Sequence, residues 1–149
     1  MKREAGFGLI EMMAVVAIII VLAGLGVPSM QEMVVNQRMK STTSDLFTTI
    51  LRARSEAIKR NADVRITPST NWNTGWTIPS PNPGEPALAS FSTRSNLTIT
   101  GPSADLVFTS AGRIRGASNP QFNIAAKNGK ARCITIDLGG RPNIQNKSC

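Results

Sequence analysis

The sequence predicts an α+β protein, in which one long N-terminal helix packs on a C-terminal antiparallel β domain. Three observations support this fold class. Residues 7–28 are almost entirely apolar, with 17 hydrophobic residues of 22. Residues 30–59 contain neither Gly nor Pro, whereas residues 61–149 hold eight of the nine prolines and eight of the twelve glycines. Uninterrupted segments favour helix, and frequent Gly and Pro are typical of short strands joined by turns.

The chain of 149 residues is predicted to have four consecutive parts. Its apolar run is long enough for a bilayer-spanning helix, which needs roughly 20 apolar residues. Lys2 and Arg3 favour a cytoplasmic N-terminus, so the chain beyond the apolar run is expected to be exported. The parts are a leader at residues 1–6, a transmembrane helix at 7–28, an amphipathic helix at 29–60 and a β-rich globular domain at 61–149.

Glu11 is the one charged residue between residues 7 and 27. A carboxylate inside a membrane helix is costly and usually has a partner, so a plain single-pass anchor leaves Glu11 unexplained. A secretory signal peptide needs a small-x-small cleavage site, which Gly24-Leu25-Gly26 matches poorly. Both interpretations stay open beside a third one that supplies a partner for Glu11.

A weak point is predicted near the end of the apolar helix. Gly24 and Gly26 are poor helix formers, and Pro28 lacks an N–H and clashes with the carbonyl four residues earlier. This segment is predicted to melt or bend when the subunit leaves the bilayer. The alternative is an ordinary kink where the helix exits the membrane.

The amphipathic helix is predicted from apolar residues that recur mostly at three- and four-residue spacing. Glu56 and Arg60 form an i,i+4 pair in the favourable order, and Asn61 is a plausible stop. The predicted apolar stripe consists of Leu46, Phe47, Ile50, Leu51, Ala53, Ala57 and Ile58.

Short strands are predicted between turn clusters in the C-terminal part. Residues 79–86 carry four prolines and cannot pair in the centre of a sheet, so they are predicted to form an exposed loop. The tryptophans Trp72 and Trp76 are expected to pack in the core. The predicted strands are residues 63–67, 75–78, 97–100, 106–109, 122–126 and 131–138.

Composition argues against catalysis. The chain has no His, which removes the commonest general base and the commonest transition-metal ligand. No Gly-rich phosphate loop and no cluster of metal ligands occurs in the sequence. We therefore predict no enzyme activity, no cofactor and no metal site.

Most of the net charge of +8 lies near the C-terminus. Residues 106–149 hold seven basic residues against one acid, Asp137. Such a basic segment indicates nucleic acid, an anionic surface or an acidic protein as a partner, or simply a solvated face. The seven are Arg113, Arg115, Lys127, Lys130, Arg132, Arg141 and Lys147.

Cys133 and Cys149 are the only cysteines. In an oxidising compartment two cysteines normally pair, and closing this loop would stabilise the fold by about 3 kcal/mol. Two free thiols are the alternative.

Residues 6–11, Gly-Phe-Gly-Leu-Ile-Glu, resemble the class III signal of type IV pilins and type II secretion pseudopilins, with Gly8 in place of the usual Thr. The resemblance implies that a prepilin peptidase cleaves between Gly6 and Phe7 and that Phe7 is then N-methylated. It also implies that Glu11, the fifth residue of the mature chain, pairs with the N-terminal amine of a neighbouring subunit.

Four further segments resemble the GspH/FimT/FimU group of minor pilins. The resemblance implies the type IV pilin fold and a minor pilin that acts in pilus assembly at the bacterial inner membrane. Such a subunit spans the membrane once, with a periplasmic C-terminus, and later lies at or near the pilus tip. Its partners would be the prepilin peptidase, other minor pilins and the major pilin. The segments are ARSEAIKR at 53–60, WNTGWTI at 72–78, FTSAGR at 108–113 and RCITIDLGGR at 132–141.

Two alternative functions follow from the same resemblance. One is a GspH-like pseudopilin of type II secretion, and the other is a minor pilin that binds DNA for natural transformation. In FimT members a Gly-Arg-x-Arg element near the C-terminus is associated with DNA. Here Gly112-Arg113-Ile114-Arg115 matches one hairpin earlier than expected, and Gly140-Arg141-Pro142-Asn143 lacks the second arginine. DNA binding, if present, would be sequence-independent and salt-sensitive.

Overall fold

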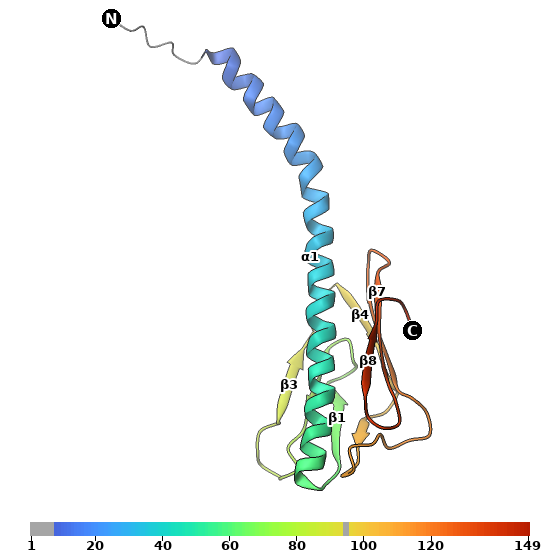
Figure 1. The fold of residues 1–149 in the computed structure, drawn as a ribbon. Coiled ribbons are helices and arrows are strands. Elements are labelled where there is room, and N and C mark those ends of the chain that lie inside the picture. The colour runs from blue at the N-terminus through green and yellow to red at the C-terminus, as the bar shows by residue number, and fades with distance from the viewer. Residues whose placement is uncertain (1–7, 94–95) are drawn as a thin grey trace, which may run out of the picture. The chain divides into compact units, whose positions relative to one another are not determined.

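The computed structural model describes residues 8–93 and 96–149, the side chains of residues 25–29 excepted. Within them the chain forms one long helix followed by short strands (Figure 1). The elements are α1 (Leu9–Arg60), β1 (Val64–Pro68), β2 (Gly75–Ile78), β3 (Ala89–Ser92), β4 (Leu97–Thr100), β5 (Leu106–Phe108), β6 (Gln121–Ala126), β7 (Ala131–Ile136) and β8 (Pro142–Gln145).

The chain divides into two compact units, Met1–Val34 and Val35–Cys149. In the first unit, the described large apolar side chains of α1 are exposed, with Leu9 and Ile10 each 80% accessible. No helix in the described part of the chain is both long and apolar enough to cross a membrane.

The second unit contains two antiparallel sheets of four strands. Their strand orders are β3-β2-β1-β5 and β4-β6-β7-β8. In the second sheet, Phe122 lies opposite Ile134 and Cys133 lies opposite Gln145. Figure 1 shows the C-terminal half of α1 running past the strands. The result is the predicted α+β arrangement of a helix packed on antiparallel sheets.

One hydrophobic core joins the helix to both sheets. Side chains of α1 that are spaced by three or four residues point into it, as an amphipathic helix requires. Trp72 and Trp76 are buried in the same core, which confirms the packing role predicted for them. The indole of Trp76 donates a hydrogen bond to Thr49 Oγ1 at 3.0 Å, and that of Trp72 donates to the Pro102 carbonyl at 2.8 Å. The helical core residues are Met39, Leu46, Ile50, Ala53 and Ala57.

The predicted apolar stripe is partly wrong. Leu51 and Ile58 are 42% and 52% exposed, because each lies one residue, or about 100° of helical rotation, past a buried position. Two threonines are buried instead. Thr43 and Thr49 donate their hydroxyls to the carbonyls four residues earlier, each at 2.7 Å, so their polar groups are satisfied inside the core.

The end of α1 agrees with the prediction. Asn61 has a φ of 50°, the left-handed conformation that ends many helices, and the Ala62 N–H donates to the Ala57 carbonyl at 3.2 Å. Glu56 and Arg60 form the predicted pair at 2.6 Å. The hydrogen bond from Arg60 lowers the pKa of Glu56.

The strand predictions missed β3 and β8 and set other ends too late. β5 ends at Phe108 rather than residue 109, and β7 ends at Ile136 rather than 138. Both missed strands are sheet edges, and β8 begins with Pro142, which is tolerated at an edge. Their pairing is imposed by β2 and β7, so local composition gave little signal. The proline-rich loop at residues 79–86 is irregular and largely exposed, as predicted.

Candidate functional site

Glu11 caps the beginning of α1. The Gly8 N–H donates to Glu11 Oε2 at 3.0 Å, and the Glu11 N–H donates to the Gly8 carbonyl at 3.1 Å. A carboxylate at this position also complements the positive end of the helix dipole. Gly6 and Phe7, where cleavage and methylation are predicted, lie outside the described residues.

The predicted weak segment of α1 is helical in this structure. Gly24, Gly26 and Pro28 all lie within the uninterrupted span of the helix. A Cβ added at Gly24 would meet nothing within 4 Å. Melting of this segment during assembly therefore stays a prediction.

The predicted disulfide is present between Cys133 and Cys149, with an S–S distance of 2.06 Å and a Cα–Cα distance of 5.1 Å. Cys133 is buried on β7. The Ser148 hydroxyl and the Cys149 N–H both donate to Asn123 Oδ1 on β6, at 3.3 and 3.4 Å. The bridge thus ties the segment after β8 to the second sheet.

Three of the segments that resemble minor pilins contact one another near the C-terminal end of β7. Arg54 donates a hydrogen bond from Nε to the Gly112 carbonyl at 3.0 Å. Gly140 packs against the same carbonyl so closely that a Cβ there would collide with it. Both glycines have positive φ, 71° at Gly112 and 78° at Gly140, a conformation that side chains rarely adopt. We call the region that contains Arg54, Gly112, Arg115, Gly140 and Arg141 the arginine end.

Two arginines of the arginine end form ion pairs with nearby aspartates. Arg115 forms an ion pair with Asp63, and Arg141 Nε lies 3.3 Å from Asp137 Oδ2. The Arg141 N–H also donates to Asp137 Oδ1 at 2.8 Å. This hydrogen bond, helped by the Arg141 charge, lowers the pKa of Asp137. Within the Gly-Arg-x-Arg element, the buried Ile114 separates Arg115 from the exposed Arg113.

A second group of basic residues lines a groove of about 460 Å³ at the opposite end of β7. Lys40 comes from α1, Lys130 from the turn before β7, Arg132 from β7 and Lys147 from the disulfide-tied segment. We call this the basic groove. Lys127 lies exposed in the adjoining turn.

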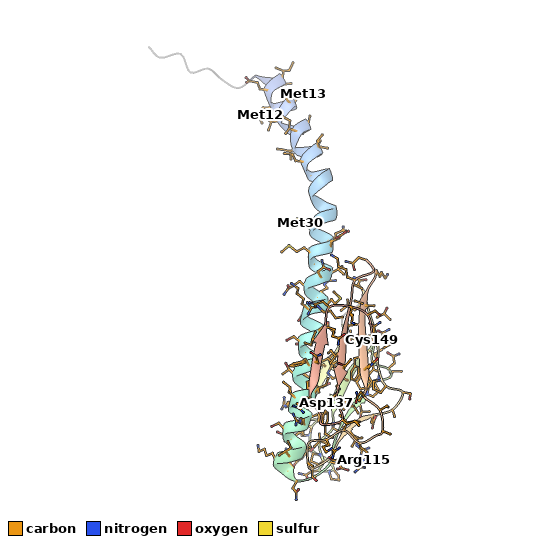
Figure 2. The ribbon with its side chains drawn as sticks, turned by 45° about the vertical axis from the view of Figure 1, so that its right-hand side comes forward. Met12, Met13, Met30, Arg115, Asp137 and Cys149 are labelled. Carbon is orange, nitrogen blue, oxygen red and sulfur yellow. A yellow bond between two sulfur atoms is a disulfide. The ribbon has the colours of Figure 1, made fainter. Side chains whose placement is uncertain are left out.

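The seven predicted basic residues therefore do not form one patch. Figure 2 shows Arg115 well separated from Cys149, which is two residues after Lys147. Lys40 and Arg54 were missed because residues this far from the C-terminal segment in sequence give no local signal. No group of three or more His, Cys, Asp or Glu side chains that could hold a metal occurs among the described residues.

Comparison with known proteins identifies the two parts of the sequence separately. Residues 42–140 match the family described as Type II transport protein GspH, and residues 1–27 match the prokaryotic N-terminal methylation motif. No curated protein sequence gives a significant match.

Solved structures share the fold. Two crystal forms of the type IV minor pilin FimU from Pseudomonas aeruginosa are 25% identical in sequence. Their TM-scores are 0.62 and 0.59, covering 74% and 71% of this chain and 90% and 91% of theirs. The minor pseudopilin EpsH from the type 2 secretion system of Vibrio cholerae has a TM-score of 0.55 at 15% identity, covering 73% of this chain and 97% of its own. The α+β fold is that of type IV pilin-like proteins. Because the family match spans more than half of the sequence, this chain belongs to the GspH family of minor pilins and pseudopilins.

Proposed function

We propose that this protein is a minor type IV pilin that acts in pilus assembly at the inner membrane and is incorporated at or near the pilus tip. The observation that carries the proposal is the union, in one chain, of the N-terminal methylation motif with a GspH-family β domain. In the proposed pathway the prepilin peptidase removes residues 1–6 and methylates Phe7. Residues 7–28 anchor the subunit, with the β domain in the periplasm, until it joins other minor pilins and the major pilin.

The exposed apolar face of α1 supports this pathway. Side chains such as Ile18, Ile20 and Leu22 are 59–66% exposed. Leaving them in water is costly, because burying one such side chain is favourable by about 1.5–3 kcal/mol. Lipid can cover them before assembly and neighbouring subunits afterwards. Melting at Gly24, Gly26 and Pro28 would adapt the helix to the second environment.

A pilus subunit is favoured over a secretion pseudopilin by similarity. The sequence is 25% identical to FimU and 15% identical to EpsH, and the TM-score is also higher for FimU, 0.62 against 0.55. The pseudopilin remains the alternative. Deleting the gene should reduce surface pili while leaving type II secretion intact, and the reverse result would replace our proposal with the pseudopilin function.

The assembly role of Glu11 is tested by the Glu11→Ala variant of the full chain. We expect the variant to be cleaved and methylated normally, because the cleavage site is unchanged, but to be absent from sheared pili. Immunoblotting of pili and intact-mass measurement of the membrane-bound form give the two readouts.

Glu85→Ala is the matched control, because Glu85 is an exposed carboxylate in the loop of the β domain. It should enter pili at the native level. Normal incorporation of Glu11→Ala would contradict the role that we assign to this carboxylate.

DNA uptake is a second candidate, favoured by one observation, the exposed guanidinium of Arg113 in the Gly-Arg-x-Arg element. Arg115 in the same element is paired with Asp63, which reduces the charge available to phosphate. A gel shift with duplex DNA at low and moderate salt tests this function. No shift at low salt eliminates it.

A further inference from the structure

The basic groove has a donor-rich, acid-free lining. It collects Lys40, Lys130, Arg132 and Lys147 together with the amides of Asn36 and Asn146. No acidic side chain is among the described residues that line it. A cavity of this kind presents hydrogen-bond donors and positive charge from several directions, which suits a phosphate group.

Three of the cations are available to a ligand. Lys40, Arg132 and Lys147 have no ion pair with any residue that the structure describes. At the arginine end, in contrast, Arg115 and Arg141 each have an acidic partner. Because all three cations line one groove, an anion bound there would be attracted by each of them.

The groove is held in shape by the fold. Arg132 is half-buried on β7, Lys40 follows the core residue Met39 on α1, and the disulfide keeps the segment of Lys147 on the second sheet. These anchors come from α1, from β7 and from the segment after β8. A ligand would therefore find the cations already gathered, at little cost in chain entropy.

The lining gives little support for nucleobases. No aromatic side chain is among the described residues that line the groove, whereas single-stranded nucleic acids bind largely by stacking on aromatic rings. Its volume of about 460 Å³ suits one headgroup rather than a polymer track. The chemistry that the groove recognises is a single phosphodiester or phosphate.

The position of the groove along the chain indicates the source of that phosphate. Asn128, in the turn before β7, contacts Asn36 through its side-chain amide at 3.5 Å. Asn36 follows the predicted membrane segment, residues 7–28, by eight residues, which reach at most about 28 Å even when fully extended. A chain connection this short keeps the groove near the headgroup phosphates of the adjacent leaflet.

We propose that the basic groove binds the phosphate of an anionic phospholipid headgroup while the subunit is anchored in the membrane. This inference rests on the membrane anchoring in the proposed function and adds a partner to it. The bound headgroup holds the β domain near the bilayer surface until the subunit is extracted into the filament.

The test uses the full chain, purified in detergent, and native mass spectrometry with dioleoylphosphatidylglycerol or zwitterionic dioleoylphosphatidylcholine. We expect at least about tenfold more phosphatidylglycerol than phosphatidylcholine adduct, since each cation near an anionic surface adds roughly fivefold. The triple variant Lys40→Gln/Arg132→Gln/Lys147→Gln should lose this preference. Near-native circular dichroism establishes that it is folded.

The control variant Arg52→Gln/Arg65→Gln/Arg113→Gln removes the same number of charges elsewhere and should keep the preference. Equal binding of the two lipids by the native chain, or a preference that survives in the groove variant, overturns the proposal. So does complete displacement of phosphatidylglycerol by inorganic phosphate or by a labelled oligothymidylate, which would assign the groove to a free ion or to DNA.

A separate measurement distinguishes failure of the headgroup proposal from failure of the proposed membrane anchoring. Alkaline washing of membranes that contain the full chain tests anchoring directly. A chain that stays in the membrane but shows no lipid preference refutes only the headgroup site. A chain that washes off refutes the anchoring and with it the physiological role of the groove.

Discussion

The two ends of β7 carry the same kind of charge and use it differently. At the arginine end, Arg54 donates to a backbone carbonyl, and Arg115 and Arg141 have acidic partners. In the basic groove, Lys40, Arg132 and Lys147 share a lining whose described residues include no acid. Basic residues that are equivalent in a charge count are therefore structural at one end and available to a ligand at the other.

The difference changes the meaning of the Gly-Arg-x-Arg element. Gly112 lies where Arg54 and Gly140 converge, so the first position of this element maintains the fold irrespective of any ligand. Short ion pairs at exposed positions add little stability by themselves. The close contact of the two glycines and the part-buried hydrogen bond of Arg54 contribute more to stability.

The largest effect is expected from Gly140→Val at the arginine end. The new side chain would clash with the Gly112 carbonyl and would require a φ of 78°. We expect a loss of about 4 kcal/mol in the free energy of unfolding, measured by chemical denaturation. Gly129 in the turn beside the groove has a similar φ of 80° but open space around it, so Gly129→Val should cost only about 1 kcal/mol. Equal losses would show that the glycine contact is unimportant.

The next largest effect concerns the groove end. Replacing both Cys133 and Cys149 by Ser removes a cross-link over a sequence separation of 16 and should cost about 3 kcal/mol. Hydrogen exchange should accelerate in residues 146–149 and stay unchanged in residues 137–141. Acceleration at both ends alike would contradict the independence of the two regions.

A smaller loss is expected from Arg54→Met, which leaves the Gly112 carbonyl without its donor. The expected cost is about 2 kcal/mol in thermal or chemical unfolding. Arg52→Met removes an exposed arginine from the same helix and should change stability by less than about 0.5 kcal/mol. If Arg54→Met leaves the free energy of unfolding unchanged, the hydrogen bond of Arg54 does not stabilise the arginine end.

The smallest effect is a pH dependence confined to the arginine end. The pKa of Asp137 is lowered by the Arg141 N–H and the Arg141 charge. Its ionised form therefore stabilises the fold above the unfolded pKa, and this stabilisation is lost as the pH falls through the folded pKa. Between about pH 5 and pH 2, the melting temperature of the native protein should fall more than that of Asp137→Asn. Parallel curves would argue against the contribution of this carboxylate.

Local pattern predicted the fold well where the signal lay within one element. The absence of Gly and Pro and the spacing of apolar residues located the helix, and Asn61 ended it as expected. The same pattern misassigned Leu51 and Ile58, because periodicity alone does not fix which edge of an apolar stripe meets the core. The strands β3 and β8 escaped prediction because their pairing depends on neighbours rather than on their own residues.

The sequence by itself determined the α+β class and the N-terminal methylation motif, and it favoured pairing of the two cysteines over two free thiols. Tertiary structure alone decided which basic residues share a surface. Lys40 and Lys147 lie more than a hundred positions apart in the chain yet line one groove, and Arg54 meets Gly112 across 58 positions. Hydrophobic periodicity is local and can be found in sequence, whereas the gathering of charges depends on how sheets pack on a helix.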